Sequence, residues 1–239
     1  MEVTGGTLLG GRVRHAQPCH GHRTGIEPVL LAASIAARPG QRVLEGGSGA
    51  GAGLLCLAAR VPDIVGLGVE LDPDLAALAR RNGADNGASG LLFEAGDIGT
   101  FRGDGAFDHA FANPPWHAEG TASPDAGREV AKRADPGLFK RWTGGLAGPL
   151  RARGSLTLVV SAGCVPECLA AFALAGCGSP AIFPLWSKPG RAAKLVLLRG
   201  IKGGRGPSRV LAGLTLHRDD GGYTAEAEAV LRDGAAIVI

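Results

Sequence analysis

The chain has 239 residues, of which 45% are hydrophobic and 20% are charged, and its formal net charge is +3. These values are typical of a folded globular protein and exclude a disordered or collagen-like chain. The sequence contains neither an apolar run of 18 or more residues nor an N-terminal signal pattern, so we expect a soluble, cytoplasmic protein without a membrane span.

The five cysteines predict neither a disulfide framework nor a metal site. Their number is odd, and Cys164 and Cys168 are four residues apart without a second pair at metal-ligand spacing. We therefore expect buried or incidental thiols and no bound metal.

The N-terminal residues 1–24 are rich in glycine, histidine and arginine. They predict a basic arm of irregular or short extended structure, either solvated or in contact with phosphate. A helical pattern follows over residues 26–37, with Pro28 in its first turn, and Arg38-Pro39-Gly40 ends it.

Strands and helices then alternate along the chain. Apolar runs predict strands at 42–45, 65–70, 91–95, 106–112, 155–161, 180–186 and 193–200. The intervening segments predict helices at 54–60, 72–86, 126–150 and 165–175. The last two strands form a hairpin that can add an antiparallel strand. This order predicts an α/β, Rossmann-like fold, with a seven-stranded, mostly parallel sheet and helices on both faces.

The C-terminal extension, residues 201–239, continues the same domain. It begins with a basic loop at 201–209, is extended at 210–217 and is helical at 223–233. No internal repeat or linker interrupts the sequence, so we expect one domain over residues 1–239.

A glycine-rich segment, Glu45-Gly46-Gly47-Ser48-Gly49-Ala50-Gly51, connects the strand at 42–45 to the next helix. Such a turn brings main-chain N–H groups close to a ligand. Glu70 ends the following strand, where a carboxylate can accept hydrogen bonds from both hydroxyls of a ribose. Three interpretations stay open at this point: a dinucleotide site, an adenosyl-methionine site, and a purely structural turn.

The segment Asn113-Pro114-Pro115-Trp116 decides between them. The two prolines lack an N–H group and end the strand, which leaves the Asn113 side-chain oxygen and nearby carbonyls as hydrogen-bond acceptors. Such oxygens can hold both N–H bonds of an amine, direct its lone pair toward an electrophilic methyl group and stabilise the developing charge. Trp116 can stack on a planar substrate. We predict methyl transfer to an amino group, with Asn113, Pro114 and Trp116 as catalytic residues.

Together the two motifs resemble those of class I S-adenosyl-L-methionine-dependent methyltransferases of the Asn-Pro-Pro-aromatic type. Over nearly its full length the chain is similar to the bacterial tRNA1(Val) (adenine(37)-N6)-methyltransferase family. The similar segments are 24–33, 43–51, 68–70, 96–98, 113–116, 123–133 and 214–226. The resemblance implies methylation of N6 of an adenine in tRNA, with S-adenosyl-L-methionine as the methyl donor.

The resemblance also implies roles for individual residues. The cofactor would be bound by Glu45, Gly47, Ser48, Gly49, Gly51, Glu70, Leu71, Asp97, Ile98 and Asn113. Among these, Asp97 would meet the adenine amino group, and Asn113 would also hold the target amine. By the resemblance, Arg128, Lys132 and Arg133 would lie beside the mouth of the site. Independently of it, the basic stretches that contain Arg23 and Arg191 predict either a phosphate-binding rim for the RNA or solvated surface charge.

Three alternatives remain open. A protein glutamine amide also offers a planar NH₂ group, but that type of enzyme usually carries a separate N-terminal substrate-binding domain. A nicotinamide-dependent oxidoreductase would explain the glycine loop, although it leaves Pro114-Pro115-Trp116 without a role. A non-catalytic RNA-binding protein with this fold is disfavoured by intact Asn113 and Glu70.

Overall fold

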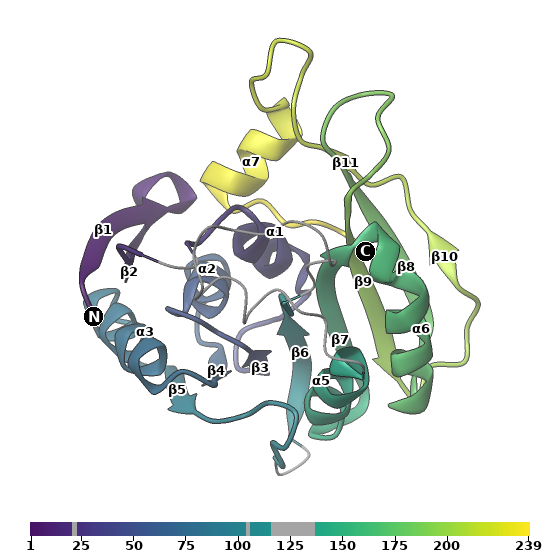
Figure 1. The fold of residues 1–239 in the computed structure, drawn as a ribbon, viewed down its shortest axis with the longest axis horizontal. Coiled ribbons are helices and arrows are strands. Elements are labelled where there is room, and N and C mark those ends of the chain that lie inside the picture. The colour runs from purple at the N-terminus through teal and green to yellow at the C-terminus, as the bar shows by residue number, and fades with distance from the viewer. Residues whose placement is uncertain (21–22, 104–105, 116–136) are drawn as a thin grey trace.

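A mostly parallel sheet forms the centre of the molecule (Figure 1), in a computed structural model that describes residues 1–20, 23–103, 106–115 and 137–239. The parallel strands, in chain order, are β3 (Arg42–Gly46), β4 (Val65–Glu70), β5 (Leu91–Ala95), β6 (Phe107–Ala112), β7 (Leu150–Ser161) and β8 (Cys177–Trp186). One strand, β9 (Leu195–Lys202), lies between β7 and β8 and is antiparallel to both. The α/β fold with an antiparallel closing hairpin is therefore confirmed.

The described sheet has nine strands in the order β10-β8-β9-β7-β6-β3-β4-β5, with β11 also paired to β8. The seven expected strands are present. The two additions, β10 (Arg209–Val210) and β11 (Leu214–Thr215), are two residues long and extend the edge at β8. Two-residue strands are too short to show a hydrophobic alternation, so the sequence indicated only an extended segment there.

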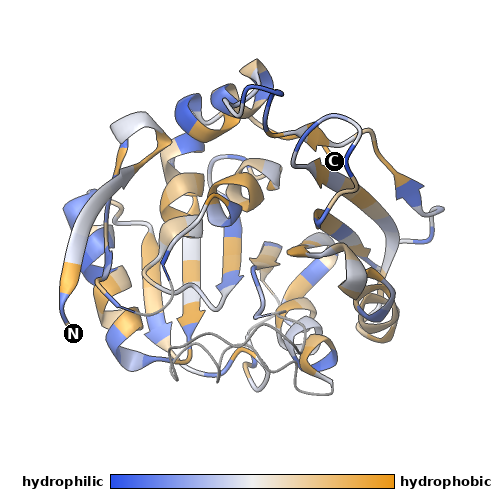
Figure 2. Cartoon of the chain, turned by 45° about the horizontal axis from the view of Figure 1, so that its top comes forward, coloured by the Kyte–Doolittle hydropathy of each residue, from blue (hydrophilic) through white to orange (hydrophobic). Residues whose placement is uncertain are grey.

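Helices cover both faces of the sheet, as expected. Their bounds are α1 (Glu27–Ser34), α2 (Ala52–Arg60), α3 (Pro73–Asp85), α5 (Leu138–Ala147), α6 (Val165–Leu174) and α7 (Ala225–Asp233). Successive residues of β3 point to opposite faces: Val43 joins the core beneath α1, α2 and α7, and Leu44 joins the core beneath α5 and α6. Figure 2 shows the hydrophobic colour along these central strands.

Several helix limits follow from local chemistry. Asp72 caps α3, because its Oδ1 accepts a hydrogen bond of 2.8 Å from the N–H of Asp74, and Pro73 begins the helix as expected. The first helix ends at Ser34, three residues before the predicted limit. Of the helix predicted at 126–150, residues up to 136 lie outside the described residues, and the described remainder forms α5. The prediction was wrong at its end, because α5 stops at Ala147 and Leu150 already begins β7, which was expected from residue 155.

The N-terminal segment differs from a solvated arm. It forms a hairpin of β1 (Val3–Leu8) and β2 (Val13–Pro18), joined through the short 3-10 turn η1 (Leu9–Gly11), beside α3 in Figure 1. A second 3-10 turn, η2 (Ala162–Cys164), precedes α6. The guanidinium of Arg12 donates to the carbonyl oxygens of Asp233 (2.7 Å) and Ala59 (2.8 Å), and that of Arg14 donates to the carbonyl of Asp85. These two cations anchor the hairpin to the rest of the protein. The short extended structure expected for residues 1–24 is present, and the contact of this segment with phosphate stays a prediction.

Among the described helices, none is both long and apolar enough to cross a membrane. The same part of the chain contains no group of three or more His, Cys, Asp or Glu side chains arranged to hold a metal ion. All five cysteines are free.

Candidate active site

The predicted site residues meet at the carboxyl edge of the sheet. Gly46 of β3 is paired with Val69 of β4 on one side and with Ala112 of β6 on the other. Glu70 is paired with Ala95 of β5. The residues at or just after these strand ends therefore lie along one edge of the sheet, in the order Asp97, Glu70, Gly47, Asn113. This is the edge at which open α/β sheets bind ligands.

The glycine loop needs its glycines for backbone conformation. Gly47, Gly49 and Gly51 have φ values of 64°, 54° and 88°, in the left-handed region that favours glycine. The N–H of Gly47 donates to the carbonyl oxygen of Val69 at 2.8 Å, which ties the loop to β4. A Cβ atom on Gly49 would have no heavy atom within 4 Å, so this part of the loop borders open space.

Glu70 connects the loop to the next strand end. Its half-buried carboxylate accepts hydrogen bonds from the N–H of Gly49 (2.7 Å, Oε2) and of Asp72 (3.0 Å, Oε1). Each carboxylate oxygen has a second lone pair, so the group can still accept from a vicinal diol. The neighbouring Leu71 is 72% exposed and adds an apolar surface beside it.

Glu45 lies beneath the loop and is only 5% exposed. Its Oε2 accepts a hydrogen bond of 3.0 Å from the N–H of Leu54 in the first turn of α2. A Cβ atom on Gly53 would collide with the same carboxyl group. Burial raises the pKa of Glu45 to about 8, the Leu54 N–H lowers it and the charge of Glu70 raises it further. Glu45 therefore acts as a neutral or partly ionised support for the start of α2.

Two other predicted cofactor residues have their side chains in the interior. Ser48 faces Gly68, and among the described residues its buried Oγ has no hydrogen-bond partner. Ile98 is 3% exposed and packs against Gly46 and Leu146. Only the main chain of these residues is positioned to meet a ligand.

Asp97 remains exposed at the end of β5. Its Oδ1 accepts a hydrogen bond of 2.7 Å from the N–H of Gly99, which fixes the carboxylate in the turn after the strand. The other oxygen, Oδ2, is positioned to accept a hydrogen bond from an amino group.

Asn113 directly follows the residue paired with Gly46, so it lies beside the glycine loop. Its side chain is half-buried and Pro114 is buried. Trp116, the predicted stacking residue, lies outside the described residues, as do Arg128, Lys132 and Arg133.

Trp142 of α5 is a site residue that the sequence analysis missed. A Cβ atom on Gly47 would lie 2.6 Å from the Cη2 atom of its indole ring, so the ring covers the first turn of the glycine loop. The sequence contains only three tryptophans, and their rarity was the one available signal. The contact depends on where α5 crosses the sheet, which hydrophobic periodicity does not determine.

Two predicted RNA-binding cations are described, and both are exposed. Arg191 lies in the turn between β8 and β9 at the carboxyl edge, because Ser161 at the end of β7 is paired with Leu195 at the start of β9. Arg23 precedes α1, close to Thr24, whose N–H donates to Gln17 Oε1 at 2.9 Å. Their contact with RNA stays a prediction.

Residues 26–146 match the profile of a protein family described as "Methyltransferase small domain". Several relatives are named tRNA1(Val) (adenine(37)-N6)-methyltransferase, among them proteins from Bacteroides thetaiotaomicron and Actinobacillus succinogenes. The one from Bacteroides thetaiotaomicron is 28% identical over 140 residues, which span 58% of this chain and only 59% of the relative. The one from Actinobacillus succinogenes is 28% identical over 218 residues, which span 88% of this chain and 89% of the relative.

Other similar proteins differ in name. A "Release factor glutamine methyltransferase" from Geobacter sulfurreducens is 37% identical over 99 residues, or 41% of this chain and 33% of the relative. The solved structure of a protein described as a predicted O-methyltransferase from Agrobacterium tumefaciens has a TM-score of 0.74 and 25% identity, covering 89% of this chain and 99% of that one. This likeness shows a shared fold.

Proposed function

Because the chain belongs to the methyltransferase small domain family, we propose that it transfers a methyl group from S-adenosyl-L-methionine to N6 of an adenine in tRNA. One observation carries this proposal: the pairing of Gly46 with Ala112 brings Asn113 beside the glycine loop. The glycine loop that would hold the cofactor and the oxygens that would bind the amine thus follow neighbouring strand ends. The full-length similarity to the Actinobacillus relative supports adenine in tRNA as the substrate, and a tRNA substrate implies a cytoplasmic reaction.

The residues at the edge fit this cofactor. The glycine loop is open at Gly49, where main chain can approach a ligand closely. Glu70 would hold the ribose hydroxyls, and Asp97 would accept a hydrogen bond from the adenine amino group. The exposed side chain of Leu71 would cover the ring between them. Glu45 and Ile98 would support these groups without touching the cofactor: Glu45 holds the first turn of α2, and Ile98 packs against Gly46.

When bound, S-adenosyl-L-methionine supplies an electrophilic methyl group on a positively charged sulfur. The chain positions the amine that receives it. Asn113 Oδ1 and the adjacent main-chain carbonyl would accept both N–H bonds of the amine, which directs the nitrogen lone pair toward the methyl group and stabilises the positive charge on nitrogen. Alignment of the amine nitrogen with the methyl group would supply much of the rate enhancement, so no strong general base is required. Trp116 would stack on the target base after it leaves the RNA stack.

The direct test is an assay with purified protein, methyl-labelled S-adenosyl-L-methionine and tRNA that lacks modifications. Digestion of the RNA should release labelled N6-methyladenosine. The proposal fails if the cofactor binds and no label enters RNA.

A second candidate is methylation of a protein glutamine, which the 37% identity to the Geobacter relative over 99 residues favours. The same assay with bacterial release factors in place of tRNA separates the two. Label in protein and none in tRNA would select this alternative.

The Asn113→Ala variant tests the role of the amide. We expect a loss of methyl transfer of at least about 100-fold, in line with the removal of one preorganised hydrogen-bonding group. The affinity for S-adenosyl-L-methionine, measured by calorimetry, should stay within a few-fold of wild type. A large loss of cofactor affinity would instead show that Asn113 serves the cofactor.

A further inference from the structure

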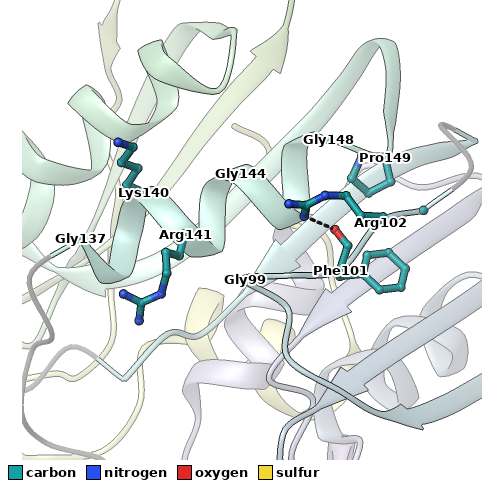
Figure 3. Close-up of a pocket in the computed structure, with 10 residues that line it drawn as sticks. Gly99, Phe101, Arg102, Gly137, Lys140, Arg141, Gly144, Gly148 and Pro149 are labelled. Carbon is teal, nitrogen blue, oxygen red and sulfur yellow. Dashed lines mark hydrogen bonds between the residues drawn. The ribbon is translucent and has the colours of Figure 1, made fainter.

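A groove of about 640 Å³ runs along α5, between this helix and the loop that follows β5 (Figure 3). Ten residues line it, among them Gly99, Arg102, Lys140, Arg141, Gly144 and Pro149. We call it the α5 groove. Its size falls in the range of roughly 300–1,000 Å³ that is usual for ligand sites.

The α5 groove is cationic. Of the ten lining residues that the structure describes, three are Lys or Arg and none is Asp or Glu. The side chains of Arg102 and Lys140 are exposed, and Arg102 Nη1 donates to the carbonyl oxygen of Phe101 at 2.8 Å. Figure 3 shows Arg102 on the loop side of the groove, with Lys140 and Arg141 on α5. An anionic ligand can therefore meet positive charge from both walls.

The groove adjoins the candidate active site through two elements. Gly99 lines the groove, and its N–H donates to Asp97 Oδ1 at 2.7 Å. On α5, Trp142 contacts Gly47 of the cofactor loop. Lys140 and Gly144 are four residues apart, so they lie on the same stripe of the helix. Gly99 follows the carboxyl end of β5, whereas Pro149 precedes Leu150, which is paired with Phe107 at the amino end of β6. The groove therefore runs along α5 from the carboxyl edge of the sheet toward its amino edge.

We propose that the α5 groove binds the phosphate backbone of single-stranded RNA that flanks the target nucleotide. This inference rests on the proposed function, since it assigns part of the surface that would hold the RNA. Lys140 and Arg141 leave α5 in different directions and Arg102 lies on the opposite wall (Figure 3), so positive charge borders the groove at several points, as on surfaces that track a nucleic-acid backbone. Phe101 and Pro149 add apolar lining. Guanidinium groups bind phosphate through two parallel hydrogen bonds, which favours Arg102 as an anchor.

Gly144 makes the proposal testable without removing a cation. A Cβ atom at this position would have no heavy atom within 4 Å, so larger side chains fit there and project into the groove. Three variants of similar size differ only in charge: Gly144→Glu, Gly144→Gln and Gly144→Lys. Replacing glycine in a helix interior is itself favourable, and Gly144→Gln controls for this effect.

The measurement is tRNA affinity by fluorescence anisotropy at several salt concentrations, with cofactor affinity determined in parallel. We expect Gly144→Glu to bind tRNA at least tenfold more weakly than Gly144→Gln, and Gly144→Lys to bind more tightly. Removing one single-strand phosphate contact, with Lys140→Ala or Arg102→Ala, should reduce the slope of log affinity against log salt by about 0.7. Arg81→Ala, an exposed cation on α3, is the matched control and should leave the slope unchanged.

The outcomes separate this inference from the proposed function. If wild-type protein methylates tRNA and all three Gly144 variants bind it equally, the groove inference is overturned and the function stands. If no RNA is methylated, the function itself fails. If charge at position 144 changes the binding of poly-glutamate and leaves tRNA binding unchanged, the groove serves an acidic protein and the inference is again overturned.

Discussion

At the scale of single residues, Glu45 has the most unusual chemistry of the described site. Its carboxyl group is 5% exposed, and burial raises its pKa to about 8. The folded state therefore holds a proton that the unfolded state releases above its pKa of 4.5. The stability from this group is fully present below pH 4.5 and is lost as the pH rises through about 8.

The variant Glu45→Gln keeps the shape and the hydrogen bond from Leu54 without an ionisable group. We expect its free energy of unfolding, relative to wild type, to increase with pH above 4.5 at up to about 1.4 kcal/mol per pH unit and to level off near pH 8. Urea denaturation of the cofactor-free protein at pH 5, 7 and 9 measures this difference. Glu94→Gln, an exposed acid on β5, is the control; a pH-independent difference for Glu45→Gln would contradict the argument.

The sequence predicted the convergence of Gly47, Glu70, Asp97 and Asn113, because each lies at or within two residues of the carboxyl end of a strand and parallel strands end at one edge. It did not predict that Ser48 and Ile98 turn their side chains inward. Side-chain direction in a tight loop depends on φ and ψ, which motif spacing does not specify.

At the scale of elements, the attachment of the N-terminal hairpin to α3 is unexpected. Asn82 Nδ2 donates to the carbonyl oxygen of Ala16 at 2.8 Å, and its Oδ1 accepts from the N–H of Ala16 at 3.0 Å. Asn86 makes the same pair of bonds with Arg14, at 2.7 and 2.9 Å. Residues four apart on a helix and two apart on a strand have similar spacing, about 6 Å. The side-chain amides of Asn82 and Asn86 thus make with β2 the pairs of hydrogen bonds that a neighbouring strand would make. Hydrophobic periodicity does not indicate such a pattern.

Asn82 also donates to the carbonyl oxygen of Ala50 in the glycine loop at 2.9 Å, and it is 1% exposed. We expect Asn82→Ala to destabilise the protein by about 2–4 kcal/mol, because several buried polar groups lose their partners. It should also weaken cofactor binding. Asn86→Ala, which is half-buried and has no bond to the loop, should cost about 1–2 kcal/mol and leave cofactor affinity unchanged. Urea unfolding and calorimetry measure the two effects; equal cofactor affinities would show that Asn82 does not position the loop.

At the scale of the whole molecule, a second buried group opposes Glu45. His109 lies toward the amino end of β6, where it is hydrogen-bonded to Ser155 Oγ (2.7 Å) and Gln41 Oε1 (3.1 Å). Burial lowers its pKa to about 4; Asp108 raises it, and Arg151 and Arg199 lower it further. As the pH falls below 6.5, the unfolded chain binds a proton at His109, whereas the folded protein does not bind it until the pH approaches 4. Stability from His109 is complete above pH 6.5 and is lost as the pH falls toward 4.

The two groups predict the shape of the pH profile. Between pH 4.5 and 6.5 their slopes have opposite signs and cancel, so the joint contribution of Glu45 and His109 to stability should be nearly constant there. This joint contribution should fall by about 2 kcal/mol between pH 6.5 and 8 as the Glu45 contribution is lost. His109→Gln removes the His109 slope, so the free energy of unfolding of wild type minus that of the variant should rise between about pH 4 and 6.5 and then stay constant. Urea denaturation at pH 4.5, 5.5, 6.5 and 8 measures this difference, and a difference that does not change with pH would show that His109 does not titrate as described.

The pairing of β3 with β6 has a consequence for how this chain can change during evolution. Gly46 faces Ala112 in a regular register, and the irregularity between β6 and β7 is confined to the opposite end, between Phe107 and His109. A slip of one residue between β3 and β6 would turn Asn113 to the other face of the sheet. Insertions after position 116 lie beyond this pairing and would leave Asn113 beside the glycine loop. A single insertion within β6 would move Asn113 away from that loop, and we expect it to abolish the proposed methyl transfer.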